Sequence, residues 1–584
     1  MQGSAKNNVR AVVESENDRP KQRARRPARP HRLLWHAWLS LRAVCLILCA
    51  PIIMLVIACF MMIGQEITAP SWVVREIEAR AQAELGGGSL GFHEIKVTIG
   101  NDLHPRLVVH DAILRDADGG VLAEVPRIEG QLSPRGALQG RVLLQQVQVI
   151  GAQIALRRAG DGTIAFAFGQ GGAELGAADG FIGLLEQIDL AFESQALEAL
   201  EQVRADGLII NYSDVRAGRS WVIDGGRISL DVSEEDLNLR GDVALLSGRS
   251  YITTAELSYN SRRDSRMANI GLNISDAAAP DIASQIAVLS WLGVLDAPIS
   301  GAMRGQLDEE GNLSALSATL QIGEGQLRPN SQTRPIPFQS ASTYMTFDPL
   351  SENLRFHLIE IDSAMGRVSG SAQTYLREYE NGWPEALLGQ VALSEVEIAA
   401  SDMFRTPVAV SNAIADFRLR LDPFTLDIGE AVVVAGEEHV QLKGLIRAAS
   451  RGWSVALDAQ TDSIQSDQVL GFWPEILAPK TQSWLRENLR GGNLTDVSLA
   501  FRGQPEEKPS FALSMEFDEA EVGFMRTMPQ IERGRGTLSI VDRRLALEVT
   551  EGHVSAPQGG QIDLSGSTFV IPQTGPRALS LIHI

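Results

Sequence analysis

Residues 417–428 read Phe-Arg-Leu-Arg-Leu-Asp-Pro-Phe-Thr-Leu-Asp-Ile, and this stretch decides the fold. Apolar Phe417, Leu419 and Leu421 alternate with charged residues, and the alternation resumes after an Asp-Pro break and runs to Ile428. Because successive side chains of a β-strand point to opposite faces, a period of two predicts two strands, each with one apolar face. The break between them predicts a turn.

The same alternation covers most of the chain after residue 88. It predicts a hairpin around Asp542-Arg543-Arg544, and Asp161-Gly162 and Asn381-Gly382 are further turn signals. Other alternating sets are Val455/Leu457/Ala459, Val497/Leu499/Phe501, Phe511/Leu513/Met515/Phe517, Leu538/Ile540 and Leu545/Leu547/Val549. We therefore predict a mostly β protein whose antiparallel strands share one apolar face.

Helical spacing is confined to short segments, which are 71–85, 181–203, 281–293 and 480–489. Short helices cannot cover the apolar face of about 25 strands, since such a sheet extends about 120 Å at ~4.8 Å per strand. The prediction is an elongated, curled antiparallel sheet, in which the apolar face stays open as a groove. Several closed sandwiches in a row are the alternative.

The β region also contains an internal repeat. Alternating strands begin after Pro335, Pro407 and Pro529 and end at Gly370, Gly444 and Gly566, with separations of 35, 37 and 37 residues. A repeated β-meander of roughly 50 residues is the simplest explanation.

Charge is distributed unevenly along the 584 residues. Residues 1–42 carry ten Lys and Arg against three acidic residues, whereas the whole chain has a net charge of −20, which leaves −27 for the rest. With 44% apolar residues the chain is too hydrophobic to be disordered, and the acidic body argues against a nucleic-acid partner. The basic tail is explained as a membrane-topology signal, with binding of anionic lipid or nucleic acid as the alternative.

Residues 43–64 form an uncharged, mostly apolar segment. At about 1.5 Å per residue it reaches roughly 33 Å, which is enough to cross a bilayer core of ~30 Å. A signal peptide is the alternative, but its apolar run is usually about 7–15 residues. We predict an uncleaved transmembrane helix with a cytoplasmic tail 1–42 and the body on the other side.

Cysteine usage agrees with this topology. Cys45, Cys49 and Cys59 all lie in the apolar segment, so the body contains no cysteine. This excludes disulfides from the body and is consistent with an oxidising compartment such as the periplasm.

Two short motifs resemble catalytic or metal-binding motifs, but the residues and elements around them do not fit those functions. Residues 87–91 match G-x-S-x-G, but they lie between a predicted helix and a strand, the reverse of a nucleophile elbow. Residues 116–119 resemble the start of a calcium loop, but position 12 is Arg127 instead of Glu. We predict no enzyme, no catalytic residue, no cofactor and no metal site; a periplasmic hydrolase would need a convergent polar cluster.

A family resemblance follows from these residues. The single span, the short helix and the glycine-rich start of a long β region resemble the AsmA-like superfamily of Gram-negative envelope proteins, to whose N-terminal region Leu107–Arg158 is similar, with Asp118-Gly119 at its first turn. Gly471-Phe-Trp-Pro474, Ala478-Pro479, Trp484-Leu485, Asn488-Leu489 and Gly491-Gly492, followed by Leu499–Gly503, resemble the central domain of the YhdP-like branch. There, a Trp-Pro precedes a short helix containing Trp, which is followed by Asn, Gly and a new strand.

The resemblance covers most of residues 35–584 and implies a domain organisation. The expected segments are the basic cytoplasmic tail 1–42, the transmembrane helix 43–64, the AsmA-like region 65–180, the β-groove repeats 181–470, the signature helix and turn 471–503, and a further repeat 504–584. Because YhdP-like proteins extend further, the chain is expected to be the N-terminal part of a longer, truncated protein.

The resemblance also implies a function. The function implied is that of a bridge-like lipid transfer protein, which would be anchored in the bacterial inner membrane with a periplasmic body and would move phospholipids between inner and outer membranes without chemistry. Its partners would be phospholipid and the inner membrane, with outer-membrane or periplasmic proteins in addition. An envelope assembly factor that binds outer-membrane proteins by strand addition is the alternative.

The candidate lipid-binding residues are the apolar members of the alternating sets. Each of them equally fits a protein core. They are Phe417, Leu419, Leu421, Leu426, Ile428, Val497, Leu499, Phe511, Leu513, Met515, Phe517, Leu538, Ile540, Leu545, Leu547 and Val549.

Overall fold

The structure is a computed structural model of the whole chain. It describes residues 42–583 apart from 43–48, 52, 55–56, 58–60, 62, 72–73, 76–88, 101–103, 116–120, 134–135, 137–140, 142, 168–174, 179–198, 247–248, 264, 400–406, 475–478, 524–528 and 574–580. The chain divides into two units, one of 1–65 with 98–103 and one of 66–97 with 104–584. Each unit is described by itself.

In the first unit, the described residues of the apolar segment, among them Cys49, Met54 and Met61, are helical, and Ile63 bridges Ile99. Most of the predicted span 43–64, and tail residues 1–41, lie outside the described residues. Within the described part of the chain, no helix combines the length and the apolar character needed to cross a membrane.

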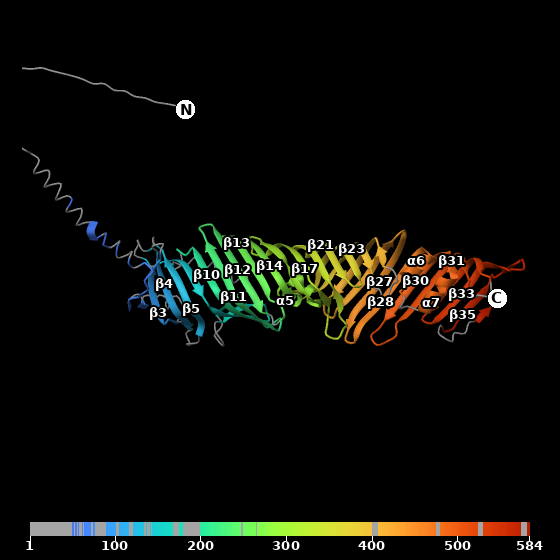
Figure 1. Cartoon of the computed structure of the whole chain (residues 1–584), viewed down its shortest axis with the longest axis horizontal. Helices are drawn as coiled ribbons and strands as arrows, with labels where there is room; N and C mark the ends of the chain where they lie inside the picture. Colours follow the sequence, from blue (N-terminus) through green and yellow to red (C-terminus); the bar gives the residue numbers. More distant parts are fainter. Residues whose placement is uncertain are drawn as a thin grey trace, which may run out of the picture. The chain divides into compact units, whose positions relative to one another are not determined.

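The second unit is built on one large sheet, to which 33 of the described strands belong (Figure 1). The first are β1 (Ile67–Thr68), β2 (Ser89–Gly91), β3 (Glu94–Ile99), β4 (Pro105–Arg115), β5 (Val121–Leu132), β6 (Leu144–Ile150), β7 (Gln153–Arg158), β8 (Ile164–Ala167) and β9 (Leu175–Ala178). The next are β10 (Gln202–Asp214), β11 (Arg219–Val232), β12 (Asp236–Leu246), β13 (Thr253–Arg262), β14 (Ala268–Ala278), β16 (Pro298–Leu307) and β17 (Leu313–Ile322).

The remaining strands cover the second half of the chain. They are β20 (Ser340–Asp348), β21 (Asn353–Ser363), β22 (Gly366–Glu380), β23 (Trp383–Ile398), β24 (Val408–Val410), β25 (Asn412–Arg420), β26 (Thr425–Ala435), β27 (Glu438–Ala449), β28 (Gly452–Gln465), β29 (Leu489–Arg490), β30 (Asn493–Gly503), β31 (Ser510–Val522), β32 (Ile531–Val541), β33 (Arg544–Ser555), β34 (Gln561–Asp563), β35 (Ser567–Ile571) and β36 (Leu581–His583). A small separate sheet contains β15 (Leu295–Asp296), β18 (Gly325–Leu327) and β19 (Ile336–Phe338).

The prediction of a large antiparallel sheet is confirmed. From β10 onward the long strands pair antiparallel and in chain order, as from β20 through β21 and β22 to β23. One departure lies at β10, which pairs in parallel with β6 and β7. The chain reaches β10 only after β8 and β9, so β10 returns to the sheet in the same direction as the strands beside it.

Two predicted hairpin turns are present with the expected backbone. Asn381 and Gly382 have φ of 49° and 80°, the left-handed values of the two-residue turns that match strand twist. Asp542 and Arg543 join β32 to β33, and Val541 lies opposite Arg544. The Pro-to-Gly segments of the predicted repeat each contain successive strands, with Gly370 in β22, Gly444 in β27 and Gly566 between β34 and β35.

The described helices are few and short. Those described over their whole length are α5 (Ala279–Gln285), the 3₁₀ helix η1 (Ala287–Val294), α6 (Ser466–Phe472) and α7 (Pro479–Asn488). The predicted helix 480–489 is α7, and the predicted helix 281–293 is split at Ile286 into α5 and η1. Of the predicted helix 181–203, residues 181–198 lie outside the described part, while Gln202 and Val203 belong to strand β10. In the predicted helix 71–85, Ser71, Val74 and Arg75 are helical, and most of the rest lies outside the described residues.

The sheet is curled, as one contact between distant strands demonstrates. The Arg216 guanidinium, in the β10–β11 turn, lies 3.6 Å from the ring centroid of Trp383 at the start of β23. Ten strand pairings separate β10 from β23 along the ladder, so a flat sheet would hold them about 48 Å apart. Because neighbouring antiparallel strands run in opposite directions, these two turns lie at opposite ends of the strands. The curl of the sheet brings the two turns together.

One face of the sheet, which we call the inner face, contacts α5, η1, α6 and α7. Leu289 and Leu292 of η1 are buried against Met303, Met345 and Leu354 of the sheet. Fully burying a side chain of this size contributes roughly 1.5–3 kcal/mol, so this cluster anchors the helices to the inner face.

Candidate functional site

All sixteen sequence-predicted residues lie on the inner face. The strand register places Leu419 opposite Leu426 and Phe417 opposite Ile428. Further along the ladder, Leu499 lies opposite Leu513, which in turn lies opposite Ile540. The same register places Leu545 and Leu547 opposite Ile540 and Leu538. The alternation in the sequence therefore predicted the correct face over residues 417–549.

Helices cover this face in two stretches, so the prediction of a face left open throughout is wrong. The first cover, α5 and η1, packs on strands β14–β23. The second cover, α6 and α7, places Trp473 and Leu485 against Phe511, Met515 and neighbouring side chains. Short helices suffice because the curled sheet turns its own inner-face side chains toward one another, which reduces the apolar area left to cover.

Beside the second cover, the inner face forms an open groove with a cavity of about 380 Å³. A cavity of this size falls in the range of small-molecule pockets. Its walls are almost entirely hydrocarbon, and the polar side chains among them are Gln460 and Thr461. The lining residues are Ile398, Val408, Val410, Val433, Val440, Leu442, Ala459, Gln460, Thr461, Ile464, Val469, Phe472, Trp473, Pro474, Val497, Leu499, Phe511 and Leu513.

The predicted residues fall into groups according to this geometry. Val497, Leu499, Phe511 and Leu513 line the open groove, and all of these except Leu499 are also buried members of the cluster beneath the second cover. Phe417, Leu419, Leu421, Leu426 and Ile428 are half-buried, and Leu419 and Leu421 pack toward the first cover. Met515, Phe517, Leu538, Ile540, Leu545, Leu547 and Val549 belong to the cluster beneath the second cover. For that last group the alternative, a protein core, describes their surroundings.

Packing beneath the second cover is incomplete. Two partly open apolar cavities of about 40 and 60 Å³ adjoin the second cover: the first lies between α6–α7 and the sheet, and Trp484 of α7 borders the second. Side chains that line such unfilled space lose the dispersion contacts that a packed neighbour would provide.

A polar hollow of about 970 Å³ adjoins the open groove, and Val410 lines both. It runs along one edge of the sheet, over the ends of strands β14–β24. Ser342, Ser369 and Ser394 are in its lining, as are carboxylates such as Glu360 and Glu395. Hydrocarbon walls and a wet, polar edge therefore lie side by side.

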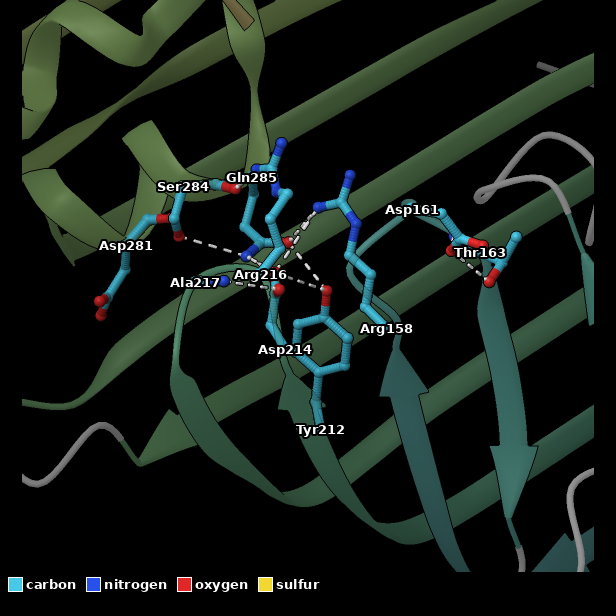
Figure 2. A network of polar contacts seen from close by, with 10 residues as sticks. All are labelled: Arg158, Asp161, Thr163, Tyr212, Asp214, Arg216, Ala217, Asp281, Ser284 and Gln285. Carbon is cyan, nitrogen blue, oxygen red and sulfur yellow. Dashed lines mark hydrogen bonds and ion pairs between the residues drawn. The ribbon is translucent and has the colours of Figure 1, made fainter. Parts of the chain in front are cut away.

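A polar network ties the first cover to strand β10 (Figure 2). The Asp214 side chain is buried, with 1% of the residue exposed, and accepts hydrogen bonds from the Ala217 N–H and from the Gln285 amide, both at 2.9 Å. The Tyr212 hydroxyl donates to Gln285 Oε1 at 2.9 Å, and Arg158 Nη1 lies 3.6 Å from the Asp214 carboxylate. Burial of the phenol, followed by the charge of Asp214, raises the pKa of Tyr212.

Arg216 extends this connection to the backbone of α5. Its Nη2 donates to the Ser284 carbonyl at 2.6 Å, while its guanidinium stacks on Trp383. Burial lowers the pKa of Arg216. The helix, the β10–β11 turn and the start of β23 are therefore held together at one point of the curl.

A second connection lies further along the ladder. Trp453, in β28, donates its Nε1–H to the Arg334 carbonyl at 2.7 Å, and its ring packs edge-on against Phe424 at 5.8 Å between centroids. Asn330 donates to the Ala448 carbonyl at 3.3 Å. The segment between β18 and β19 is thereby fixed to the ends of β27 and β28.

Sequence reasoning missed these polar residues and α6. The partners of Asp214 come from positions up to 71 residues away, and only the folded sheet brings them together. The signal for α6 was present but weak, because Val469, Leu470 and Phe472 have helical spacing within only seven residues. For metal sites, His, Cys, Asp and Glu of the described residues nowhere gather in groups of three or more.

Comparisons with known proteins give one family. No curated protein matches the chain. No solved structure matches it either. A family model described as YhdP protein matches residues 326–584, which include the open groove and the second cover. Residues 326–584 are thus similar to the YhdP family, and this match supports the resemblance to the YhdP-like branch of the AsmA-like group.

Proposed function

We propose that the chain holds phospholipid acyl chains in the open groove and moves them between the inner and outer membranes of the bacterial envelope. The observation that carries this proposal is a 380 Å³ groove with hydrocarbon walls on a face that remains apolar over many strands. Exposing each acyl CH₂ to water costs about 0.8 kcal/mol, so a chain of about 16 carbons needs continuous apolar cover.

The neighbouring polar hollow supports this proposal. A phospholipid has a hydrocarbon part and a hydrated headgroup, and Val410 lies where the apolar groove meets the polar edge. A lipid at this boundary keeps its acyl chains against the inner face while its headgroup stays in water. No bond is made or broken in this process, so it requires no catalytic residue.

The membrane anchor is part of the same proposal. Residues 43–64 have the length and apolarity to span an inner membrane, and the charge excess of 1–42 orients that span with its N-terminus in the cytoplasm. The acidic, cysteine-free body would then lie in the periplasm, where lipid must cross an aqueous gap.

Strand addition to outer-membrane proteins is less well supported. In the described ladder, the long strands between β10 and β33 have paired neighbours on both sides, so most of their backbone groups are already paired. An added strand needs an unpaired edge. The open groove, in contrast, is accessible along the inner face.

A charge placed in the groove tests the proposal. Leu513 is unsuitable because it is 5% exposed, so Leu513→Asp would bury an unpaired charge and unfold the region under any hypothesis. Leu442 is half-buried in the groove wall, and the exposed Gln441 beside it points to the other face. We expect Leu442→Asp to keep the fold and to lose bound phospholipid at least about tenfold, because the charge removes apolar cover over one or more methylenes.

The measurement is mass spectrometry of phospholipid that co-purifies with the full chain. Gln441→Asp is the matched control, because it adds the same charge on the opposite face and should retain lipid. A wild-type chain without lipid, or equal lipid on both folded variants, would contradict the proposal.

A further inference from the structure

Three apolar cavities follow one another along the inner face, and neighbouring cavities share lining residues. The open groove and the 40 Å³ cavity share Val469 and Trp473. The 40 and 60 Å³ cavities share Trp484, Phe517 and Leu547 among their walls. The series therefore begins in the open groove, continues past Trp473 and ends beside Trp484 of α7.

Trp473 lies between the open groove and the 40 Å³ cavity, and it has contacts on two sides. Its carbonyl accepts a hydrogen bond from the buried Gln482 amide of α7 at 2.7 Å. Its ring packs edge-on against Phe511 of β31, with 6.3 Å between centroids. The second cover thus has a defined edge facing the groove, and beyond that edge the walls are almost wholly apolar.

The apolar lining of the two smaller cavities indicates which kind of group they can hold. Ser466 Oγ, at the rim, is already bonded to the Gly491 carbonyl at 3.0 Å. At the far end Ser567 Oγ is buried and has no partner in the described part of the chain, so one polar atom cannot hold a chain of water molecules. The 40 Å³ cavity lies against α6 and α7, the 60 Å³ cavity is bordered by Trp484 of α7 and by strands, and each has room for only a few methylenes. An unbranched hydrocarbon chain fits.

We propose that these two cavities form a subsite for the terminal methylenes of an acyl chain whose remainder lies in the open groove. The inference rests on the proposed function and adds to it a limit on acyl-chain length. Chains that end beside Trp473 leave the cavities empty, whereas longer chains fill them and recover the contacts that empty cavities lose.

Variants that fill the cavities test this subsite. Leu547→Phe adds volume at the wall that both cavities share, and Ser567→Val fills the far end while removing the unpaired hydroxyl. Ala546→Val is the matched control, because Ala546 precedes Leu547 on the same strand and faces the opposite side of the sheet. Ser567→Val adds little volume, so it keeps the test valid where Leu547→Phe fails to fold.

The full-length chain is loaded from an equimolar mixture of phosphatidylethanolamines with saturated chains from dodecanoyl to octadecanoyl, and bound lipid is quantified by mass spectrometry. We expect both filling variants to lower the ratio of long to short chains about tenfold or more for each methylene excluded, and the control to match wild type. Unchanged ratios with a raised Tm would overturn the subsite, since the cavities would then be packing defects only. Absence of lipid from wild type would instead overturn the proposed function.

Discussion

Asp214 shows what a single buried charge does in a fold made of repeated hairpins. It lies at the end of β10, and its partners come from the following turn, from α5 and from β7. A buried carboxylate with two short hydrogen bonds and a nearby cation defines one arrangement of these elements. The polar network in Figure 2 therefore specifies where the first cover sits on the inner face.

Tyr212 makes this network sensitive to alkaline pH. Its pKa is raised above the ordinary 10.0 by burial and by Asp214, so folding favours the protonated phenol. Its contribution to stability is therefore fully present below pH 10 and is lost as the pH rises above 10 toward the higher folded pKa. We expect α5 and η1 to exchange amide hydrogens faster, relative to the rest of the sheet, above that pH.

Tyr212→Phe separates this effect from general alkaline unfolding. The variant loses the hydrogen bond to Gln285, which costs about 1 kcal/mol at neutral pH, and it should lose the extra alkaline sensitivity of residues 279–294. Tyr344→Phe, at an exposed position, should behave as wild type. Hydrogen exchange read by mass spectrometry checks both variants; equal alkaline sensitivity in Tyr212→Phe and wild type would contradict the assignment.

At the scale of elements, the two helical covers decide which part of the inner face is accessible. The first is fixed by a buried apolar cluster and by the polar network, whereas the second encloses cavities. α6 has one fully buried residue, Ser466, and its apolar side chains are half-buried. The second cover is thus the more loosely packed of the two.

The segment between β18 and β19 offers a test of how one element is held against another. Trp453→Phe keeps an aromatic ring against Phe424 but removes the donor to the Arg334 carbonyl, so we expect a loss of about 1 kcal/mol in local stability. Trp453→Ala also removes the ring and should cost about 3–5 kcal/mol. Hydrogen exchange of residues 328–338 measures both, and equal losses would show that the hydrogen bond contributes nothing.

Features that depend on residues close together in the sequence were predicted correctly, whereas features that depend on distant residues were not. Alternation is local, so it predicted the strands, the turns at Asn381-Gly382 and Asp542-Arg543, and the face that carries Phe417 or Leu513. Whether that face is open depends on contacts such as Leu289 with Met345, which no local pattern encodes. For the same reason, the half-buried setting of Leu419 and the closed setting of Met515 were indistinguishable before the curl was known.

At the scale of the whole sheet, each strand of the ladder contacts mainly its immediate neighbours. Stability is then close to a sum over strands and their interfaces, as in repeat proteins. A substitution that destabilises one strand should therefore affect only nearby strands. The exceptions are places where the first cover and the Arg216–Trp383 contact connect strands that are distant along the ladder.

Leu538→Ala beneath the second cover tests this independence. Leu538 is 5% exposed, so its truncation should cost about 3 kcal/mol. We expect faster hydrogen exchange in residues 494–571 and unchanged exchange in 202–262. Uniformly faster exchange in both regions would mean that the sheet unfolds as one cooperative body.

The contact between Arg216 and Trp383 has a consequence for how such a chain can change its length. An inserted hairpin between them would displace Trp383 by two strand spacings, about 10 Å, and leave the cation without its aromatic partner. The stacked pair can therefore form only when a fixed number of strands separates Arg216 from Trp383. Gain or loss of a hairpin between β10 and β23 during evolution would break this contact and lower the stability of the fold.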